Sequence, residues 1–287
     1  RVDTPKGVVD ISLHFKQSGQ SDYYYLNRLE AVHNQGRVLV EGEKFNVLIK
    51  TGEGKTNPTK AMDSMAEAVE YFKSQTGDAL LVITKGSKVE AEIATMENGK
   101  VNYVNNAFKR DYASPPLSQT FWLDHGKGFG REQAANLVQG RAVYREDLLT
   151  RDGNPYRAWM QLDNEKARDN SGNLTFRQYS DAYGFDLKTQ LDEYKILGMD
   201  DPKKLEHLEQ VLKNGGRPFV SVEKDGKETK MFLETSVRYG KLNFYAENGK
   251  PEKREQFLKE TGLEKAAGTG KGAQKSKETI QEQGIAR

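Results

Sequence analysis

The sequence lacks several features that mark common functional sites. It contains no cysteine, which excludes disulfide bonds, thiolate catalysis and cysteine-ligated zinc. No apolar run approaches the roughly 18 residues that a bilayer-spanning helix needs. We therefore expect no membrane span, no metal and no cofactor. The absence of cysteine fits a reducing cytoplasm, although a bacterial exported protein can also lack it.

Motifs for catalysis are also missing. The chain has four histidines, scattered without ligand-like spacing, and no Gly-x-Ser-x-Gly nucleophile motif. Its 42 acidic residues are too numerous to indicate a particular site. These absences favour a non-enzymatic protein. The alternative is an enzyme that gathers a carboxylate cluster in a deep pocket.

Charge and hydrophobicity limit the class of protein further. The 287 residues carry a net charge of only +2, so strong general attraction to nucleic acid or to anionic membranes is not implied. Hydrophobic residues make up 36% of the chain and charged residues 30%, which predicts a β-rich body with much polar surface.

The first part of the chain has strand, helix and hairpin patterns. Strands are predicted from Val8 to Lys50, with a turn at Asn34-Gln35-Gly36. A helix is predicted from about Thr59 to Lys73, just after Pro58. A hairpin over 79–95 and a strand at 100–104 follow. Ser114-Pro115-Pro116 then predicts a domain boundary, because consecutive prolines favour an extended connector.

The second part continues in the same style. The patterns predict helices over about 131–138 and 186–194, and a third helix opened by Asp201 as cap and Pro202 in the first turn. Strands are predicted over the following ranges: 142–149, 155–162, 174–179, and a hairpin at 219–235 closed by a strand at 240–244.

One unit occurs twice in this order. A helix, a glycine stop, a hairpin with a lysine-flanked turn and a Gly-Lys-apolar-Asn-aromatic strand appear in both halves. The fold class is therefore predicted as α+β, with two helix-plus-antiparallel-sheet units and an internal duplication. The alternative is that any two helix–hairpin units look alike. The predicted parts are 1–113, 114–263 and a flexible tail at 264–287.

Two glycine-rich segments are weak candidates for phosphate binding. Thr51 to Thr56 resembles a phosphate loop, but the glycine required five residues before Gly54 is Ile49. Gly126 to Gly130 precedes a predicted helix, yet the third position of a dinucleotide fingerprint is Arg131. Both are interpreted as connectors.

The strongest candidate site combines arginines with aromatic residues. Alternation places Arg157, Trp159 and Gln161 on one face of a strand, and Arg177 and Tyr179 on one face of the next. If the strands pair, these side chains form a surface that stacks bases and holds phosphates. The alternative is that arginine stems shield Trp159 beneath another element. The candidate nucleic-acid-binding residues are Arg141, Arg145, Arg157, Trp159, Arg177 and Tyr179.

Several runs carry a family resemblance. They are Tyr24-Tyr25-Leu26-Asn27-Arg28, Gln119-Thr120-Phe121, Asn136-Leu137-Val138-Gln139-Gly140-Arg141-Ala142-Val143, Tyr156-Arg157-Ala158-Trp159-Met160-Gln161-Leu162-Asp163, Tyr183-Gly184-Phe185-Asp186-Leu187, Lys227-Glu228-Thr229-Lys230-Met231-Phe232 and Asn248-Gly249-Lys250-Pro251-Glu252-Lys253-Arg254-Glu255. In these the chain resembles an uncharacterised family of accessory proteins of Bacteroides-type conjugative transposons and plasmids. About 90 residues here separate two motifs that are nearly adjacent in that family. The resemblance implies a bacterial mobile-element context and no particular reaction.

Three functions are consistent with these patterns. The first is a non-enzymatic accessory protein that associates with nucleic acid or a transfer complex. The second is a protein-binding module, for example one that inhibits a host defence factor. The third is an enzyme without a recognisable motif.

Overall fold

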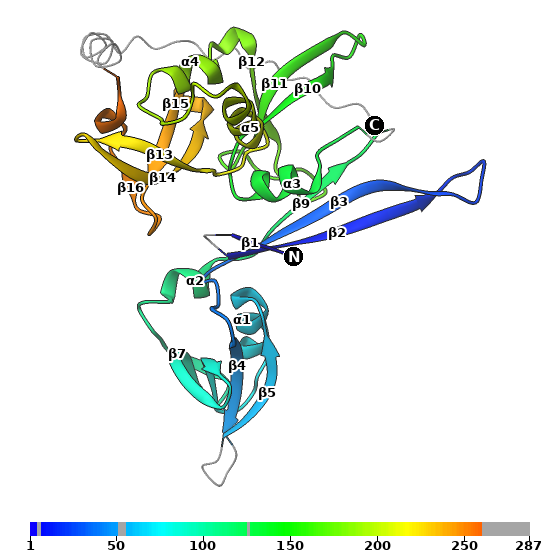
Figure 1. Cartoon of the computed structure of the whole chain (residues 1–287). Coiled ribbons are helices and arrows are strands. Elements are labelled where there is room, and N and C mark those ends of the chain that lie inside the picture. The colour runs from blue at the N-terminus through cyan, green and yellow to red at the C-terminus, as the bar shows by residue number, and fades with distance from the viewer. Residues whose placement is uncertain (5–6, 51–55, 125–126, 260–287) are drawn as a thin grey trace. The chain divides into compact units, whose positions relative to one another are not determined.

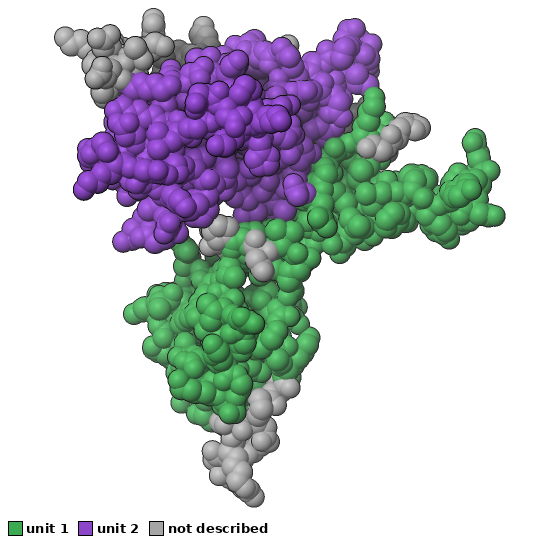
Figure 2. Space-filling view, in the orientation of Figure 1, with its two compact units in different colours: residues 1–131 green, residues 132–287 purple. Residues whose placement is uncertain are grey.

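The structure is a computed structural model that describes residues 1–4, 7–50, 56–124 and 127–259. The chain divides into two compact units, Arg1–Arg131 and Glu132–Arg287 (Figure 2). The tail predicted at 264–287 lies outside the described residues, as do most of the Thr51–Thr56 loop and the start of the Gly126–Gly130 segment.

The predicted α+β class is confirmed. Every strand pairing between the named elements is antiparallel, and the described strands form four sheets accompanied by short helices (Figure 1). Two of these sheets belong to the first unit and two to the second.

The first sheet of unit 1 has the order β1-β2-β3-β9. Its strands are β1 (Val2–Thr4), β2 (Gly7–Gln17), β3 (Tyr24–Gln35) and β9 (Leu117–Trp122). Helix α2 (Lys109–Ala113) ends just before the prolines that predicted a boundary at Ser114. The strand beyond them pairs with β3, so contacts divide the chain after Arg131 instead. After these prolines, the chain returns to the first sheet of unit 1 as strand β9.

The second sheet of unit 1 has the order β5-β4-β6-β7-β8. Its elements are β4 (Glu43–Lys50), β5 (Thr56–Met62), α1 (Met65–Lys73), β6 (Ala79–Lys85), β7 (Lys88–Glu97) and β8 (Lys100–Val104). Helix α1 buries Met65, Val69 and Phe72 in the core against this sheet.

One predicted helix boundary is wrong. The helix expected from about Thr59 begins at Met65, because Thr56–Met62 is paired with β4 as strand β5. The Ser64 side chain then accepts a hydrogen bond from the Glu67 N–H and caps the helix. Met62 ends β5 and lies three residues before Met65, so the helical spacing of apolar residues continues from the strand into the helix. That spacing therefore does not indicate where the helix begins.

Unit 2 also contains two sheets. The first, β10-β11-β12, consists of β10 (Val143–Leu149), β11 (Pro155–Leu162) and β12 (Phe176–Ser180). The second has the order β13-β14-β15-β16, and its strands are β13 (Phe219–Lys224), β14 (Lys227–Ser236), β15 (Lys241–Tyr245) and β16 (Pro251–Glu252). The predicted hairpin and its closing strand are confirmed.

The helices of unit 2 follow the sequence patterns closely. They are α3 (Arg131–Val138), α4 (Leu187–Asp192) and α5 (Pro202–Lys213). Asp201 caps α5 by accepting a hydrogen bond from the Lys203 N–H, as predicted. One apolar cluster, which includes Leu191, Leu212, Leu233 and Phe244, packs α4 and α5 against both sheets.

Candidate interaction surface

The two strands of the predicted nucleic-acid-binding face pair as expected. Strands β11 and β12 are antiparallel neighbours, with Trp159 opposite Tyr179 and Gln161 opposite Arg177. Opposite residues of an antiparallel pair lie on the same face of the sheet. The arginines and the aromatic residues are therefore brought together as the alternation predicted.

Burial rules out the role expected for the two aromatic residues. Trp159 and Tyr179 are each only 4% exposed and belong to the core of unit 2. The Trp159 ring lies 5.4 Å from the Phe185 ring and 5.2 Å from the Tyr144 ring, and the Tyr179 ring lies 4.8 Å from that of Tyr183. The segment that leads into α4 covers this face, so neither ring is open to a base. Trp159 and Tyr179 are therefore not available to stack with nucleic-acid bases.

The arginines predicted to bind nucleic acid already have partners within the protein. Arg157 donates to Asp181 at 2.7 Å, and Arg145 donates two hydrogen bonds to Asp147. Arg141 donates to the Asn136 side chain, and burial lowers the pKa of its guanidinium. A phosphate would have to displace these groups, and of these three side chains only Arg157 is largely exposed, at 62%.

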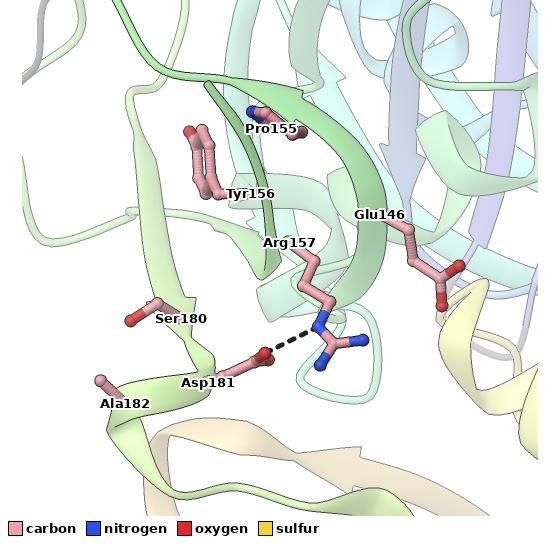
Figure 3. Close-up of a pocket in the computed structure, with 7 residues that line it drawn as sticks. All are labelled: Glu146, Pro155, Tyr156, Arg157, Ser180, Asp181 and Ala182. Atoms are coloured by element: carbon pink, nitrogen blue, oxygen red, sulfur yellow. Dashed lines mark hydrogen bonds and ion pairs between the residues drawn. The ribbon is translucent and has the colours of Figure 1, made fainter.

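Arg157 lines a hollow of about 480 Å³ at the end of β11 (Figure 3). Its side chain points to Asp181, while Glu146 projects from the neighbouring strand β10. The hollow is lined by Glu146, Pro155, Tyr156, Arg157, Ser180, Asp181 and Ala182. Two carboxylates against one guanidinium make this hollow a poor site for a polyanion.

Arg177 lines a second, polar hollow of about 230 Å³. It donates to Asp163 at 2.9 Å and to Glu165 at 3.0 Å, and Arg238 donates to the same Glu165 carboxylate. Hydrogen bonds from Arg238 and then from Arg177 lower the pKa of Glu165 to about 2. Glu234 also lines the hollow, so carboxylates outnumber guanidinium groups here as well.

Exposed apolar side chains gather elsewhere, on strands β2 and β3. We call residues 13–30 of this hairpin the arm. Strand β9 reaches only Arg28, the Leu123 N–H beyond it donates to the Asn27 carbonyl, and β1 reaches only Val9. Residues 15–17 and 24–26 therefore form a two-stranded ribbon that ends in a turn (Figure 1). The exposed side chains on or beside it are Leu13, Phe15, Tyr23, Tyr24, Tyr25 and Trp122.

The arm exposes apolar side chains and carries no net charge. Phe15 is 59% exposed and Tyr23 is 82% exposed. Lys16 and Arg28 are balanced by Asp22 and Glu30, so the arm has no net charge. The Arg28 guanidinium lies 5.2 Å from the centre of the Trp122 ring, and His14 lies 3.2 Å from Glu30.

Sequence reasoning did not select the arm as a site. The signal was the run Tyr23-Tyr24-Tyr25, because a strand with one buried face seldom carries three successive aromatic residues. That run was interpreted as an ordinary strand. Exposed apolar patches of this kind mark interaction sites in folded proteins.

Comparisons with protein-family models, curated proteins and solved structures give no match for this chain. None of the described helices combines the length and the apolar character needed to cross a bilayer. Within the described residues, no three His, Asp or Glu side chains gather into a group that could hold a metal ion.

Proposed function

We propose that this chain is a non-enzymatic binding protein whose arm docks on an apolar surface of a protein partner. One observation carries the proposal: aromatic and aliphatic side chains from Leu13 to Tyr25 are exposed on a ribbon with no net charge. Burying such side chains contributes about 25 cal/mol per Å² of apolar surface. Aromatic residues and arginine are also enriched at protein interfaces.

The neutrality of the arm favours protein over nucleic acid as its partner. Affinity for a polynucleotide comes mainly from cations that neutralise phosphates. The two cations of the arm are equalled in number by its two carboxylates, and at the base His14 contacts Glu30. The arm therefore offers contact area rather than charge.

The family resemblance supports a cellular context for this function. Under the proposal, the protein acts in the bacterial cytoplasm on behalf of a mobile genetic element. Its partner is then a component of a transfer complex or a host defence factor that it inhibits. The shared order of helix, hairpin and closing strand in α1–β8 and α5–β15 supports an internal duplication as part of the same proposal.

Site-specific photocrosslinking tests the arm directly. A photoreactive phenylalanine analogue replaces Tyr24 in one variant and Tyr239, which is exposed on the other unit, in the control. Crosslinking in cells of the native host is expected to join one defined protein to the Tyr24 position and not to the Tyr239 position.

A matched pair of substitutions completes the test. In the chain that carries the photoreactive residue at position 24, Phe15→Ser with Tyr25→Ser is expected to abolish recovery of the crosslinked partner, while Val89→Ser with Tyr103→Ser, also exposed, leaves it unchanged. Circular dichroism should show both variants folded. Equal recovery of the same partner by both variants would refute docking through the arm.

Nucleic-acid association is a second candidate function, and the Arg28–Trp122 pair favours it. A guanidinium over an exposed indole is an arrangement that stacks unpaired bases. Fluorescence anisotropy with labelled single-stranded and duplex DNA at several salt concentrations tests it. Binding that weakens steeply with salt and is lost in Trp122→Ala supports the candidate, and salt-independent or undetectable binding rejects it.

A further inference from the structure

Strand β2 has an open backbone edge over most of its length. Strand β3 lies along one side of β2, and β1 covers the other side only at Gly7, Val8 and Val9. From Asp10 to Gln17 no described strand pairs with that second side. In an antiparallel ladder, every second residue of such a strand directs its N–H and C=O groups to the open edge.

The usual devices that protect an edge strand are nearly absent from this one. The stretch from Asp10 to Gln17 contains no proline, and Lys16 is its only lysine. The register shift beside His14 adds the extra residue, Asn27, to β3 and leaves β2 regular. A regular edge with exposed Leu13 and Phe15 is suited to the addition of another strand.

We propose that this edge pairs with the same strand of a second copy of the chain. The two β2 strands run antiparallel, and Leu13 lies opposite Leu13 of the second copy on the twofold axis. Asp10 then lies opposite the second copy's Lys16, and Ile11 opposite its Phe15. Each copy contributes one residue to every pair, and the Asp10–Lys16 and Ile11–Phe15 pairs each occur twice, so the interface is complementary to itself.

Side-chain alternation selects this register. Ile11, Leu13 and Phe15 share one face of β2, and Asp10, Ser12, His14 and Lys16 share the other. With Leu13 on the axis, apolar side chains meet apolar ones and polar side chains meet polar ones. A shift of one residue places apolar side chains beside polar ones along the whole pairing.

Neighbouring structure limits the register further. One two-residue shift brings Lys16 of the second copy to Val8, which is already paired with Asp3 of β1. The opposite shift brings Asp10 to Ser18, beyond the last residue of β2. The seven residues from Asp10 to Lys16 therefore fit between the end of β1 and the turn.

The charges at the two ends can meet in this arrangement. Among the described residues, Lys16 has no ion-pair partner within its own chain. Asp10 accepts hydrogen bonds from Arg1 and Asn34. A carboxylate offers about four acceptor positions, so Asp10 retains capacity for a lysine of the second copy.

This pairing shares Leu13 and Phe15 with the proposed docking surface. It uses the backbone edge of β2 and leaves Tyr23, Tyr24 at the start of β3, and the Trp122 side chain free. Substitution of Asp10 or Lys16 disrupts the pairing without altering the docking side chains, and crosslinking at Tyr24 does not require the second copy. The two experiments therefore fail separately.

Sedimentation velocity over a range of protein concentrations tests the pairing. The unaltered chain is expected to form dimers. Asp10→Lys alone and Lys16→Asp alone each place like charges opposite each other twice, which should weaken association by about tenfold. An equimolar mixture of the two variants restores both attractions and should dimerise at least as well as the unaltered chain.

The absence of cysteine provides a second, covalent test. Leu13→Cys puts a single thiol on the twofold axis, where opposite Cα atoms about 5.5 Å apart suit a disulfide. Mild oxidation is expected to convert it to a covalent dimer, while Val89→Cys, exposed on another strand, stays monomeric. A monomeric unaltered chain, or equal crosslinking of the two cysteine variants, overturns the proposal. A mixture of charge variants that fails to recover dimerisation overturns it too.

Discussion

Trp159 and Tyr179 lie opposite each other across the β11–β12 ladder, and each side chain is 4% exposed. The same face carries Arg157 and Arg177, whose guanidinium groups reach outward to carboxylates at the ends of the strands. One sheet face is thus apolar core at its middle and ion-paired at its margin. We therefore expect substitutions of Trp159 and of Arg157 to change the stability of the protein by very different amounts.

Trp159→Ala should destabilise the protein by about 3–5 kcal/mol, because it leaves a cavity between Tyr144 and Phe185. Arg157→Ala, only two positions away but exposed, should change stability by less than about 0.5 kcal/mol. Urea unfolding followed by circular dichroism measures both. A Trp159→Ala protein as stable as Arg157→Ala would show that the ring is not in the core.

The Glu165 carboxylate should titrate far below its ordinary value. Hydrogen bonds from Arg238 and Arg177 hold its pKa at about 2, against an ordinary 4.5. NMR titration of the side-chain carboxyl carbon in Arg238→Ala is expected to show this pKa raised, while Arg157→Ala leaves it unchanged. An unaltered pKa in Arg238→Ala would exclude that ion pair in solution.

The same carboxylate predicts a pH dependence of stability. Because folding lowers its pKa, the stabilisation is present above pH 4.5 and is lost as the pH falls toward 2. Glu165→Gln should therefore lower the melting temperature at neutral pH and converge with the unaltered chain near pH 2. Differential scanning calorimetry at several pH values measures the difference.

Tyr194 predicts a loss of stability at the alkaline end. Burial beside Phe244 raises the pKa of its hydroxyl to about 12, from an ordinary 10.0. A raised pKa in the folded state means that stability is full below pH 10 and falls as the pH rises through 12. The urea midpoint of Tyr194→Phe should fall less over this interval than that of the unaltered chain. Tyr239→Phe, at an exposed position, should behave as the unaltered chain does.

Gly215 and Gly226 offer a test of packing at matched backbone geometry. Their φ angles are +74° and +72°, but a Cβ at Gly215 would lie 2.9 Å from the Ala142 carbonyl oxygen, whereas at Gly226 it meets nothing within 4 Å. Both alanine variants should lose about 1 kcal/mol to the left-handed conformation, and Gly215→Ala about 1–2 kcal/mol more. Equal unfolding free energies would refute the close approach of Ala142.

Local patterns predicted the second half of the chain better than the first. The cap at Asp201, the strand from Pro155 to Leu162 and the hairpin after Phe219 depend on residues close in sequence, and all are confirmed. The start of α1 and the partner of β9 depend on pairing with distant strands. No local pattern near Thr59 or Ser114 encodes those partners.

By itself, the sequence determined the α+β class and the strand alternation that puts Trp159 and Tyr179 on the arginine-bearing faces of their strands, because these follow from side-chain periodicity. The register that sets Trp159 opposite Tyr179 comes from the tertiary structure. Only the tertiary structure decided which face of each strand is covered. Burial depends on elements that arrive from elsewhere in the chain: the segment before α4 seals Trp159, while no strand or helix of the described chain buries Phe15 or Tyr24. For that reason the candidate site lies on the arm and not on the β11–β12 face of the second unit.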